Sequence, residues 1–442
     1  MKSLDNNTEK RWNIYMIIIS YFINNCISGI VYDVYINYLQ ETNIDVAKSF
    51  WSYYGYSMFL SAFLITLINK IGYKKILFLS VGGCSLGLFG TFLASNIYFT
   101  KFSVLLLLNG IQLHYLILLP YINKYTKSEE QVKWFSRVYY TGYVGFFLLT
   151  YLGGCMTIKI FAKDIGISFE QAKQLTNNVE KMSEFIRENY IRSMEELILI
   201  LGIASILGII PIILIKEKKS DYISSNKRKN KGIIKTIMNE RKEIFNRDSI
   251  LYCFYWGLNN FAIGLFVPYY TIYLNRILNI DKVSTSFIIS LSYVAVVMFM
   301  FFTDKIVQKI GKIKTLYISI LTALPFMLII AEGEKIETNR VLIIGVALFL
   351  RTGIMNLGGP IDSSLAVEVI KKDMIPAYTG VISCITGFAG IFSGYFTGAF
   401  LFNLENGYKL GYYIGAFLYF IGALILIFNF SKLDKIKLKE KL

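Results

Sequence analysis

The chain has 442 residues, of which 55% are hydrophobic, 16% aromatic and only 17% charged. A soluble protein of this length needs roughly a quarter of its residues charged to cover its surface, so the composition indicates a membrane protein. The single histidine, His114, excludes a multi-histidine metal site, and the five cysteines form no close pair for a zinc or redox motif. We therefore expect no metal and no cofactor, and the formal net charge of +16 needs another explanation.

Apolar runs of about 18 residues or more, long enough to cross a hydrocarbon core, recur along the whole chain. Twelve spans are predicted: Asn13–Tyr38, Phe50–Ile71, Ile76–Ile97, Phe102–Ile122, Phe135–Ile158, Leu197–Ile215, Ser249–Asn275, Ser284–Phe302, Thr315–Ala331, Val341–Ala366, Ala377–Leu401 and Leu410–Phe430. The predicted fold class is an all-α integral membrane protein with twelve transmembrane helices.

The positions of lysine and arginine predict the orientation of these spans. With both termini in the cytoplasm, the inner segments hold 32 of the 46 basic residues, the external loops hold 13, and Arg351 lies inside a span. This asymmetry follows the positive-inside rule and favours cytoplasmic N- and C-termini. The basic excess then reflects topology rather than nucleic-acid binding, since no basic stripe with interleaved aromatic residues occurs outside the spans. We expect a monomer in the cytoplasmic membrane of a bacterium.

Two long loops organise the chain. Residues 216–248 form a basic cytoplasmic linker, and they divide an N-terminal six-helix bundle (1–215) from a C-terminal one (249–442). The linker either lies on anionic lipid or is simply solvated. The external insert, residues 159–196, contains a capping-box pattern at Ser168 and Gln171, followed by apolar residues every three or four positions as far as Tyr190. It predicts an amphipathic helix that caps the outer mouth or rests on the membrane.

The two halves of the sequence repeat each other. Asn24-Asn25 reappears as Asn259-Asn260 at an offset of 235, and Lys70-Ile71-Gly72 reappears as Lys309-Ile310-Gly311 at an offset of 239. Further glycine matches follow in the same order with slowly growing offsets. Because six spans separate the copies, both run in the same direction across the membrane.

Two parallel six-span halves resemble the major facilitator superfamily of secondary transporters. That family carries a Gly-x-x-x-Asp-Arg-x-Gly-Arg-Lys motif between its second and third spans. This chain has Asn69-Lys70-Ile71-Gly72-Tyr73-Lys74-Lys75 there, with asparagine in place of the acid, and a second copy from Asp304 to Lys312. It lacks the arginine of the family's fourth-span motif and the Gly-Pro signature of drug/proton antiporters. The resemblance implies a central cavity, alternating access and no enzymatic activity.

The motif copies predict a cytoplasmic gate, in which lysines bind acids or helix C-termini of the opposite half in one state and release them in the other. The alternative is that these lysines only obey the positive-inside rule. The predicted gate residues are Asn69, Lys70, Gly72, Lys74, Lys75, Asp304, Lys309, Gly311 and Glu368.

Polar and charged groups inside spans are costly, so those that persist mark a cavity or a pairing site. Asp33 lies in the first span, Gln112 and His114 in the fourth, and Arg351 in the tenth. In the family that the chain resembles, these spans line the cavity. Asp33, His114 and Arg351 are therefore predicted to bind substrate or couple protons. The alternatives are a static Asp33–Arg351 pair and a histidine hydrogen-bonded between helices.

Asparagine, glutamine and aromatic residues in the same spans suit an amphipathic organic substrate better than a small ion. The predicted cavity-lining residues are Asn24, Asn25, Tyr32, Tyr35, Gln112, Trp256, Asn259, Asn260, Tyr269, Tyr270 and Asn356.

The leading functional hypothesis is a proton-coupled transporter that exports a small drug-like, antibiotic-like or peptide-like solute. Its partners are then the lipid bilayer, a small-molecule substrate and protons. The sequence has no Walker-type phosphate loop, so ATP drive is not encoded in this chain. A nutrient-uptake symporter of the same fold is the alternative, and a channel, a lipid scramblase or a membrane enzyme is an alternative of a different class.

Overall fold

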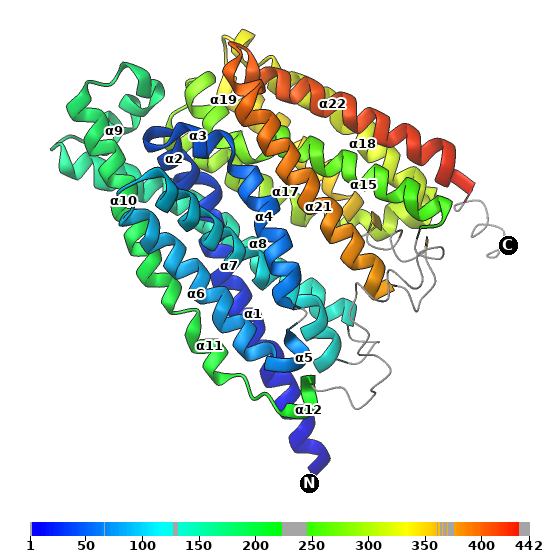
Figure 1. Ribbon diagram of the computed structural model, residues 1–442. Coiled ribbons are helices and arrows are strands. Elements are labelled where there is room, and N and C mark those ends of the chain that lie inside the picture. The colour runs from blue at the N-terminus through cyan, green and yellow to red at the C-terminus, as the bar shows by residue number, and fades with distance from the viewer. Residues whose placement is uncertain are drawn as a thin grey trace.

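A computed structural model of the chain describes residues 2–65, 67–126, 131–222, 245–359, 361–362, 365, 369 and 375–432. Every regular element in these residues is helical (Figure 1). The N-terminal half, residues 2–222, contains α1 (Lys2–Ile30), η1 (Val31–Tyr35), α2 (Ile36–Thr42), α3 (Ile44–Lys48), α4 (Phe50–Ile65), α5 (Ile68–Ile71), α6 (Tyr73–Phe92), α7 (Ile97–Tyr125), α8 (Gln131–Asp164), α9 (Phe169–Leu175), η3 (Thr176–Lys181), α10 (Glu184–Ile206), α11 (Ile209–Leu214) and α12 (Lys219–Tyr222).

The C-terminal half is described from residue 245 to residue 432, with the gaps given above. It contains α15 (Arg247–Phe266), η5 (Val267–Tyr269), α16 (Tyr270–Ile272), η6 (Tyr273–Ile277), α17 (Lys282–Ile310), α18 (Lys312–Ala331), η7 (Gly333–Lys335), α19 (Arg340–Asn356), α21 (Ile375–Ala399), η9 (Leu401–Asn403), α22 (Gly407–Ile425) and η10 (Leu426–Phe430). Linker residues 223–244, with their basic run, lie outside the described residues.

The all-α membrane fold predicted from hydropathy is confirmed. Within the described residues, ten helical stretches are long and apolar enough to cross a membrane, and they match ten of the twelve predicted spans. The other two predicted spans contain α4, with 16 residues, and α19, with 17 residues. Both of these helices are shorter than the roughly 20 residues that a straight membrane span needs.

Polar residues just before the helices fix where several of them begin. The side chains of Asn96, Ser183, Asn246 and Asp281 each accept a hydrogen bond from the backbone N–H three residues later. These bonds satisfy N–H groups that have no partner within the first turn of a helix. Such caps at the starts of α7, α10, α15 and α17 separate successive apolar runs into distinct helices.

The internal repeat is visible in the backbone. Gly72 and Gly311, 239 residues apart, have nearly identical angles, with φ of 91° and 94° and ψ of 166° and 163°. Positive φ of this kind is favourable only for glycine, so both copies of the turn need that residue. Asn25 and Asn260 also make the same bond, each donating to the carbonyl four residues earlier at 2.8 Å. The two pseudo-repeats therefore share local structure as well as sequence.

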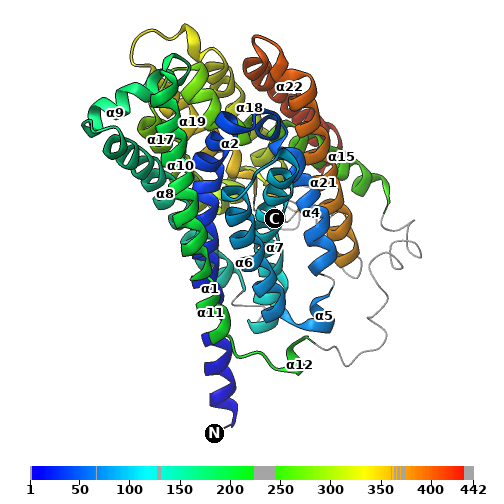
Figure 2. The ribbon, with the colours of Figure 1, turned by 60° about the vertical axis from the view of Figure 1, so that its left-hand side comes forward.

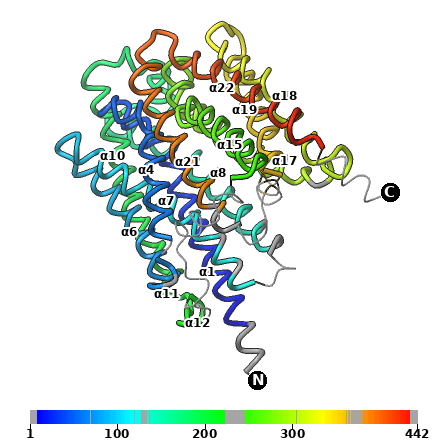
Figure 3. Tube along the Cα trace, turned by 45° about the vertical axis from the view of Figure 1, so that its right-hand side comes forward, coloured from blue at the N-terminus to red at the C-terminus, as the bar shows by residue number. Residues whose placement is uncertain are grey.

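The two halves lie side by side, and they touch along two helix pairs, α4 with α21 and α8 with α17 (Figures 1 and 3). Small residues let the backbones approach closely at these crossings. A Cβ atom on Gly55 of α4 would lie 2.5 Å from the carbonyl oxygen of Gly387, and one on Gly154 of α8 would lie 2.1 Å from Ser286 Oγ. These two crossings are therefore built for close packing between the halves.

The insert does not form the single amphipathic helix predicted from its periodicity. The predicted capping box at Ser168 and Gln171 is present, but α9 ends at Leu175. The chain then forms η3, which is kinked at Asn178 (φ −145°, ψ 78°), and restarts as α10 after the cap at Ser183. Polar residues with local hydrogen-bonding options thus break the run. The apolar residues Ala172 and Val179 join the buried cluster that contains Phe161 of α8, and α9 packs against α8 (Figure 2).

Candidate substrate cavity and the seal between the halves

A cavity of about 440 Å³ lies between the two halves and is lined by residues of both. Its N-terminal wall is aromatic and is formed by Tyr32, Trp51, Tyr143 and Phe146. Its C-terminal wall also contains aromatic residues, but most of the polar groups are there. The polar residues of that wall include Asn259, Asn260, Ser292, Arg351, Thr352, Asn356 and Asp362. A cavity of this size, with apolar walls and a few polar groups, is typical of a small-molecule site.

Arg351, which α19 places in this cavity, is the cationic residue of the lining. Only 5% of the residue is exposed. Its guanidinium lies 4.8 Å from the ring centre of Phe266 and 5.8 Å from that of Tyr419, and its Nη2 donates to the Tyr419 hydroxyl at 3.2 Å. The Nε atom has no hydrogen-bond partner. Aromatic rings thus hold the guanidinium without neutralising its charge.

Several other buried polar atoms around Arg351 have no partner either. They are Asn259 Oδ1, Tyr270 Oη and Thr352 Oγ1, all on residues that line the cavity. None of them makes a hydrogen bond of normal length, although Tyr255 lies beside Asn259 and Thr352 lies beside Tyr270. Buried polar atoms are almost always paired in folded proteins, because an unpaired one costs free energy. A group of them that faces one cavity indicates a place where a ligand supplies the missing bonds.

The sequence left open a static ion pair between Asp33 and Arg351. The structure does not contain this pair, because the ion-pair partner of Asp33 is Lys282. The Lys282 Nζ atom lies 2.5 Å from Asp33 Oδ1, and both side chains are fully buried. Thr271 donates to the same oxygen at 2.7 Å, and Ser286 donates to Oδ2 at 2.5 Å. Asp33 is on η1 of the N-terminal half, whereas its three partners belong to the C-terminal half. We call Asp33, Thr271, Lys282 and Ser286 the seal.

Lys282 is the main functional candidate that sequence reasoning missed. It is the first residue of α17, two positions before the predicted span at Ser284, so it was counted in a loop. Its Asp281 cap starts the helix earlier than hydropathy indicates, and this brings the lysine inside the protein. An aspartate within a span needs a cation nearby, and a lysine at the edge of a facing span was the signal available.

Further contacts join the halves beside the seal, at the end of the bundle remote from the N-terminus (Figure 1). Asn37 donates to Thr271 at 3.0 Å, and Tyr269 donates to the Lys48 carbonyl at 2.8 Å. Glu41 forms an ion pair with Arg276 of the C-terminal half and another, at 3.0 Å, with Arg187 of α10. The halves are therefore held together by polar contacts at this end.

The insert takes part in this closure. Asn275 donates to the Thr176 carbonyl at 2.9 Å, and the backbone N–H of Lys282 donates to Thr176 Oγ1 at 3.1 Å. Arg276 lies 3.6 Å from a carboxylate oxygen of Glu180. Although it belongs to the N-terminal half by sequence, the insert thus binds the two ends of the connection between η6 and α17.

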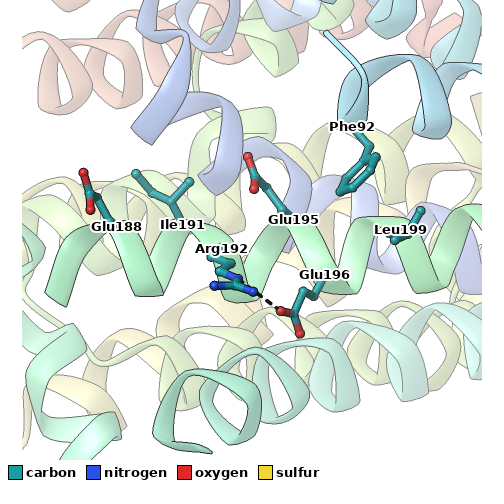
Figure 4. A pocket seen from close by; sticks show the side chains of 7 residues that line it. All are labelled: Phe92, Glu188, Ile191, Arg192, Glu195, Glu196 and Leu199. Carbon is teal, nitrogen blue, oxygen red and sulfur yellow. Dashed lines mark ion pairs between the residues drawn. The ribbon is translucent and has the colours of Figure 1, made fainter. Parts of the chain in front are cut away.

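A second, shallower pocket lies beside α10, with three glutamates in its lining (Figure 4). Arg192 pairs with Glu196 at 3.5 Å, and Glu195 accepts a hydrogen bond from Tyr38 at 3.1 Å. Two of the three acids therefore already have partners in the chain.

The residues predicted to line the cavity, to bind substrate or to couple protons fall in two groups. Those that line the cavity are Tyr32, Trp256, Asn259, Asn260, Tyr270, Arg351 and Asn356. Those placed outside its lining are Asn24, Asn25, Asp33, Tyr35, Gln112, His114 and Tyr269. His114 is buried between α6 and α7, with Nδ1 at 3.1 Å from Ser80 Oγ and no partner for Nε2. This position matches the alternative of a histidine between helices rather than a residue facing the cavity.

At the predicted cytoplasmic gate, the first motif copy contacts its own half. Lys74 Nζ donates to the carbonyls of Ile213 and Ile215 at 2.7 and 3.1 Å, at the end of α11. The Glu217 carboxylate accepts from the backbone N–H of Tyr73 at 2.6 Å and so caps α6. Burial raises the pKa of Glu217, while the bonds from Tyr73 and Lys74 oppose that shift.

The other predicted gate residues are less informative. Lys70, Lys75 and Lys309 are exposed, and Gly311 forms the equivalent turn. Glu368 and the side chains of Asn69 and Asp304 lie outside the described residues. A contact of these lysines with an acid of the opposite half therefore stays a prediction.

Comparison with known proteins agrees with this architecture. The family model described as Major Facilitator Superfamily matches residues 14–394. The chain therefore belongs to the major facilitator superfamily of transporters. No curated protein matches the sequence.

Solved structures of transporters share the fold at low sequence identity. Nucleoside transporter NupG superposes with a TM-score of 0.66 at 12% identity, covering 95% of this chain and 99% of that one. The inward-open xylose transporter XylE from E. coli gives 0.66 at 13%, covering 95% and 96%. The E. coli fucose:proton symporter FucP gives 0.60 at 13%, covering 94% and 98%. The protein is thus a multi-pass membrane transporter of this fold.

Proposed function

We propose that the protein takes up a small polar organic solute together with protons, by alternating access of the cavity to the two sides of the membrane. The observation that carries this proposal is the seal, because a carboxylate that can bind a proton there also holds the two halves together. With both termini cytoplasmic, as the basic residues predict, the seal closes the external side and the cavity serves the inside.

The direction of transport is proposed from the neighbours. Two of the transporters that share the fold are described as a D-xylose-proton symporter and a fucose:proton symporter. They support the uptake alternative rather than the efflux predicted first from the aromatic cavity. The missing Gly-Pro signature of drug/proton antiporters agrees with uptake as well.

The seal suggests how protons drive the cycle. The Lys282 ammonium and a proton compete for the same Asp33 carboxylate, since protonation removes the charge that binds the lysine. A proton arriving from the outside therefore favours separation of the halves at that end. Closure brings Lys282 back to the carboxylate and releases the proton, which in an uptake cycle leaves on the inner side. The free energy of the proton gradient is thereby coupled to the conformational change.

The test uses Asp33→Asn, which keeps the size of the side chain but removes its titratable charge. The purified protein is reconstituted in liposomes and challenged under a proton gradient with neutral solutes (xylose, fucose and uridine) and with anionic ones (glucuronate and uridine 5′-monophosphate). We expect the wild type to accumulate at least one solute against its gradient. Asp33→Asn should lose this accumulation and still exchange labelled for unlabelled solute, because exchange needs no net proton movement.

A matched control is Asp45→Asn, which changes an exposed aspartate in α3 at the same end of the bundle. It should behave as the wild type does. Accumulation by Asp33→Asn equal to the wild type contradicts the proton role. Solute movement only in the direction opposite to the proton flow contradicts uptake together with protons and restores the efflux hypothesis.

A further inference from the structure

The buried guanidinium of Arg351 has no carboxylate partner within the described part of the chain. Its recorded polar contact is the Tyr419 hydroxyl, and its charge otherwise faces the rings of Phe266 and Tyr419. A buried charge without a counter-ion costs several kcal/mol in a protein interior. A purely structural arginine would have this cost removed by an acid, as Asp33 does for Lys282.

The acid that lines the same cavity is engaged elsewhere. Asp362 accepts a hydrogen bond from the Tyr255 hydroxyl at 3.0 Å, and its backbone carbonyl accepts from Tyr252 at 3.0 Å. No ion pair between Asp362 and Arg351 occurs in the described residues. The cavity therefore contains a cation, Arg351, for which the described residues supply no acidic partner.

The atoms around this position match an oxyanion. Arg351 Nε is an unpaired donor, and the Tyr270 and Thr352 hydroxyls beside it face each other without a hydrogen bond of normal length, so that each can turn its proton toward a ligand. A carboxylate or phosphate accepts several such bonds at once, and charge-assisted bonds to arginine are about twice as strong as neutral ones. A neutral sugar or nucleoside would leave the positive charge without a counter-ion.

Aromatic residues from both halves indicate the body of the same ligand. Tyr32 and Phe146 stack with ring centres 6.1 Å apart, and Phe146 lies 4.1 Å from Tyr293. These aromatic faces, together with Trp256, favour a flat or ring-shaped organic group. The cavity of about 440 Å³ is large enough for such a molecule.

We propose that Arg351, with Tyr270 and Thr352, forms an oxyanion subsite, and that the transported solute is a small ring-containing organic acid bearing a carboxylate or phosphate. This inference rests on the proposed function and narrows it from polar solutes in general to anionic ones. The ligand's charge supplies the counter-ion that Arg351 lacks.

The test measures ligand-induced thermal stabilisation of the detergent-purified full chain with pairs of probes that differ in one charged group. The pairs are phenylacetate with phenylacetamide, glucuronate with glucose, and uridine 5′-monophosphate with uridine. We expect at least one anion to raise the melting temperature while its neutral partner does not. The first two pairs test a carboxylate and the third a phosphate.

Arg351→Gln should weaken binding of that anion by about tenfold or more, since it removes charge-assisted bonds. Arg137→Gln is the matched control, because Arg137 also lies 4.8 Å from an aromatic ring, that of Trp134, but it is exposed and outside the cavity. It should bind as the wild type does. If Arg351→Gln fails to fold, Arg351→Lys and Tyr270→Phe replace it. The lysine variant should retain part of the affinity, and loss of the Tyr270 hydroxyl should weaken the anion and not its neutral partner.

Three results overturn the inference: equal stabilisation by both members of every pair, anion binding that survives Arg351→Gln, or no stabilisation by any anion. Proton-driven accumulation of a neutral solute in the liposome experiment would leave the proposed function standing and remove only the anionic substrate class. Absence of all solute accumulation would instead count against the proposed function.

Discussion

The seal and the cavity lie in the same interface between the halves, yet they treat buried polar atoms in opposite ways. In the seal, the Asp33 carboxylate has three partners, and Lys282 is buried beside it. In the cavity, Arg351 is buried to a similar degree but has one hydrogen bond and an unpaired Nε. One region is satisfied within the chain, and the other is not.

This difference separates two tasks of a transporter. A closed end needs contacts that are complete without a ligand, so that it stays shut while the other end is open. A binding site needs polar groups whose partners come from the solute, because only then does the solute change the balance between states. The seal should therefore dominate stability, and the cavity should dominate ligand selection.

The largest effect is expected from breaking the ion pair on one side only. Lys282→Met leaves the Asp33 carboxylate buried without its cation, and removal of one partner from a buried pair costs about 3–5 kcal/mol. Thermal unfolding of the purified protein should show a clear loss of stability. The double variant Asp33→Asn/Lys282→Met should regain much of it, because asparagine carries no charge, its amide oxygen can accept from one of the two hydroxyls of Thr271 and Ser286, and its amide nitrogen can donate to the other.

The double-mutant cycle decides whether Asp33 and Lys282 stabilise each other. Strictly additive effects of the two substitutions would show that Asp33 and Lys282 do not interact energetically, and the seal would lose its physical basis. Recovery in the double variant, combined with loss of gradient-driven accumulation, would show that the pair stabilises one conformation and couples it to protons.

A smaller effect is expected at the rim of the seal. The Glu41 side chain is 4% exposed and pairs with Arg276 and Arg187, whose side chains are 15% and 46% exposed. Because these arginines reach water, Glu41→Gln should cost about 1–2 kcal/mol, between the values typical of exposed and buried pairs. Thermal unfolding measures the loss.

The control for this prediction is Glu196→Gln, which breaks an exposed pair with Arg192 on α10. Its cost should be at most about 0.5 kcal/mol. An equal cost for the two glutamates would indicate that Glu41 acts as an ordinary surface residue and that its ion pairs with Arg276 and Arg187 contribute nothing to the closure.

Sequence reasoning was accurate where a feature depends on local chemistry. Apolar runs predicted the helices, and the repeated Lys-Ile-Gly turn predicted two glycines that the structure gives the same positive φ. The capping box at Ser168 formed as expected. In each case a few neighbouring residues determine the backbone, so spacing along the chain was sufficient evidence.

The candidate site depended on contacts between distant segments, and there sequence reasoning was only partly successful. It selected Asp33 and Arg351 by the cost of burying a charge, but it joined them to each other. Lys282, 249 residues from Asp33, was placed in a loop because hydropathy does not reveal how early a capped helix starts. The periodic run after Ser168 likewise predicted one long helix, since periodicity alone does not reveal the kink at Asn178.

Among the charged residues of the seal and the cavity, the smallest effect on stability is expected at Arg351, in contrast to Lys282. Arg351→Met replaces a buried cation that lacks a counter-ion with an apolar side chain of similar length, and such exchanges are often neutral or stabilising. The lost bond to Tyr419 and the lost contact with Phe266 oppose this gain. Without ligand, the unfolding temperature of the variant should therefore correspond to a change within about 1 kcal/mol of the wild type. A loss as large as that of Lys282→Met would show that Arg351 holds the fold together, so that the cavity and the seal would no longer differ. A near-neutral result would instead show that this charge is kept for the ligand, since the fold does not need it.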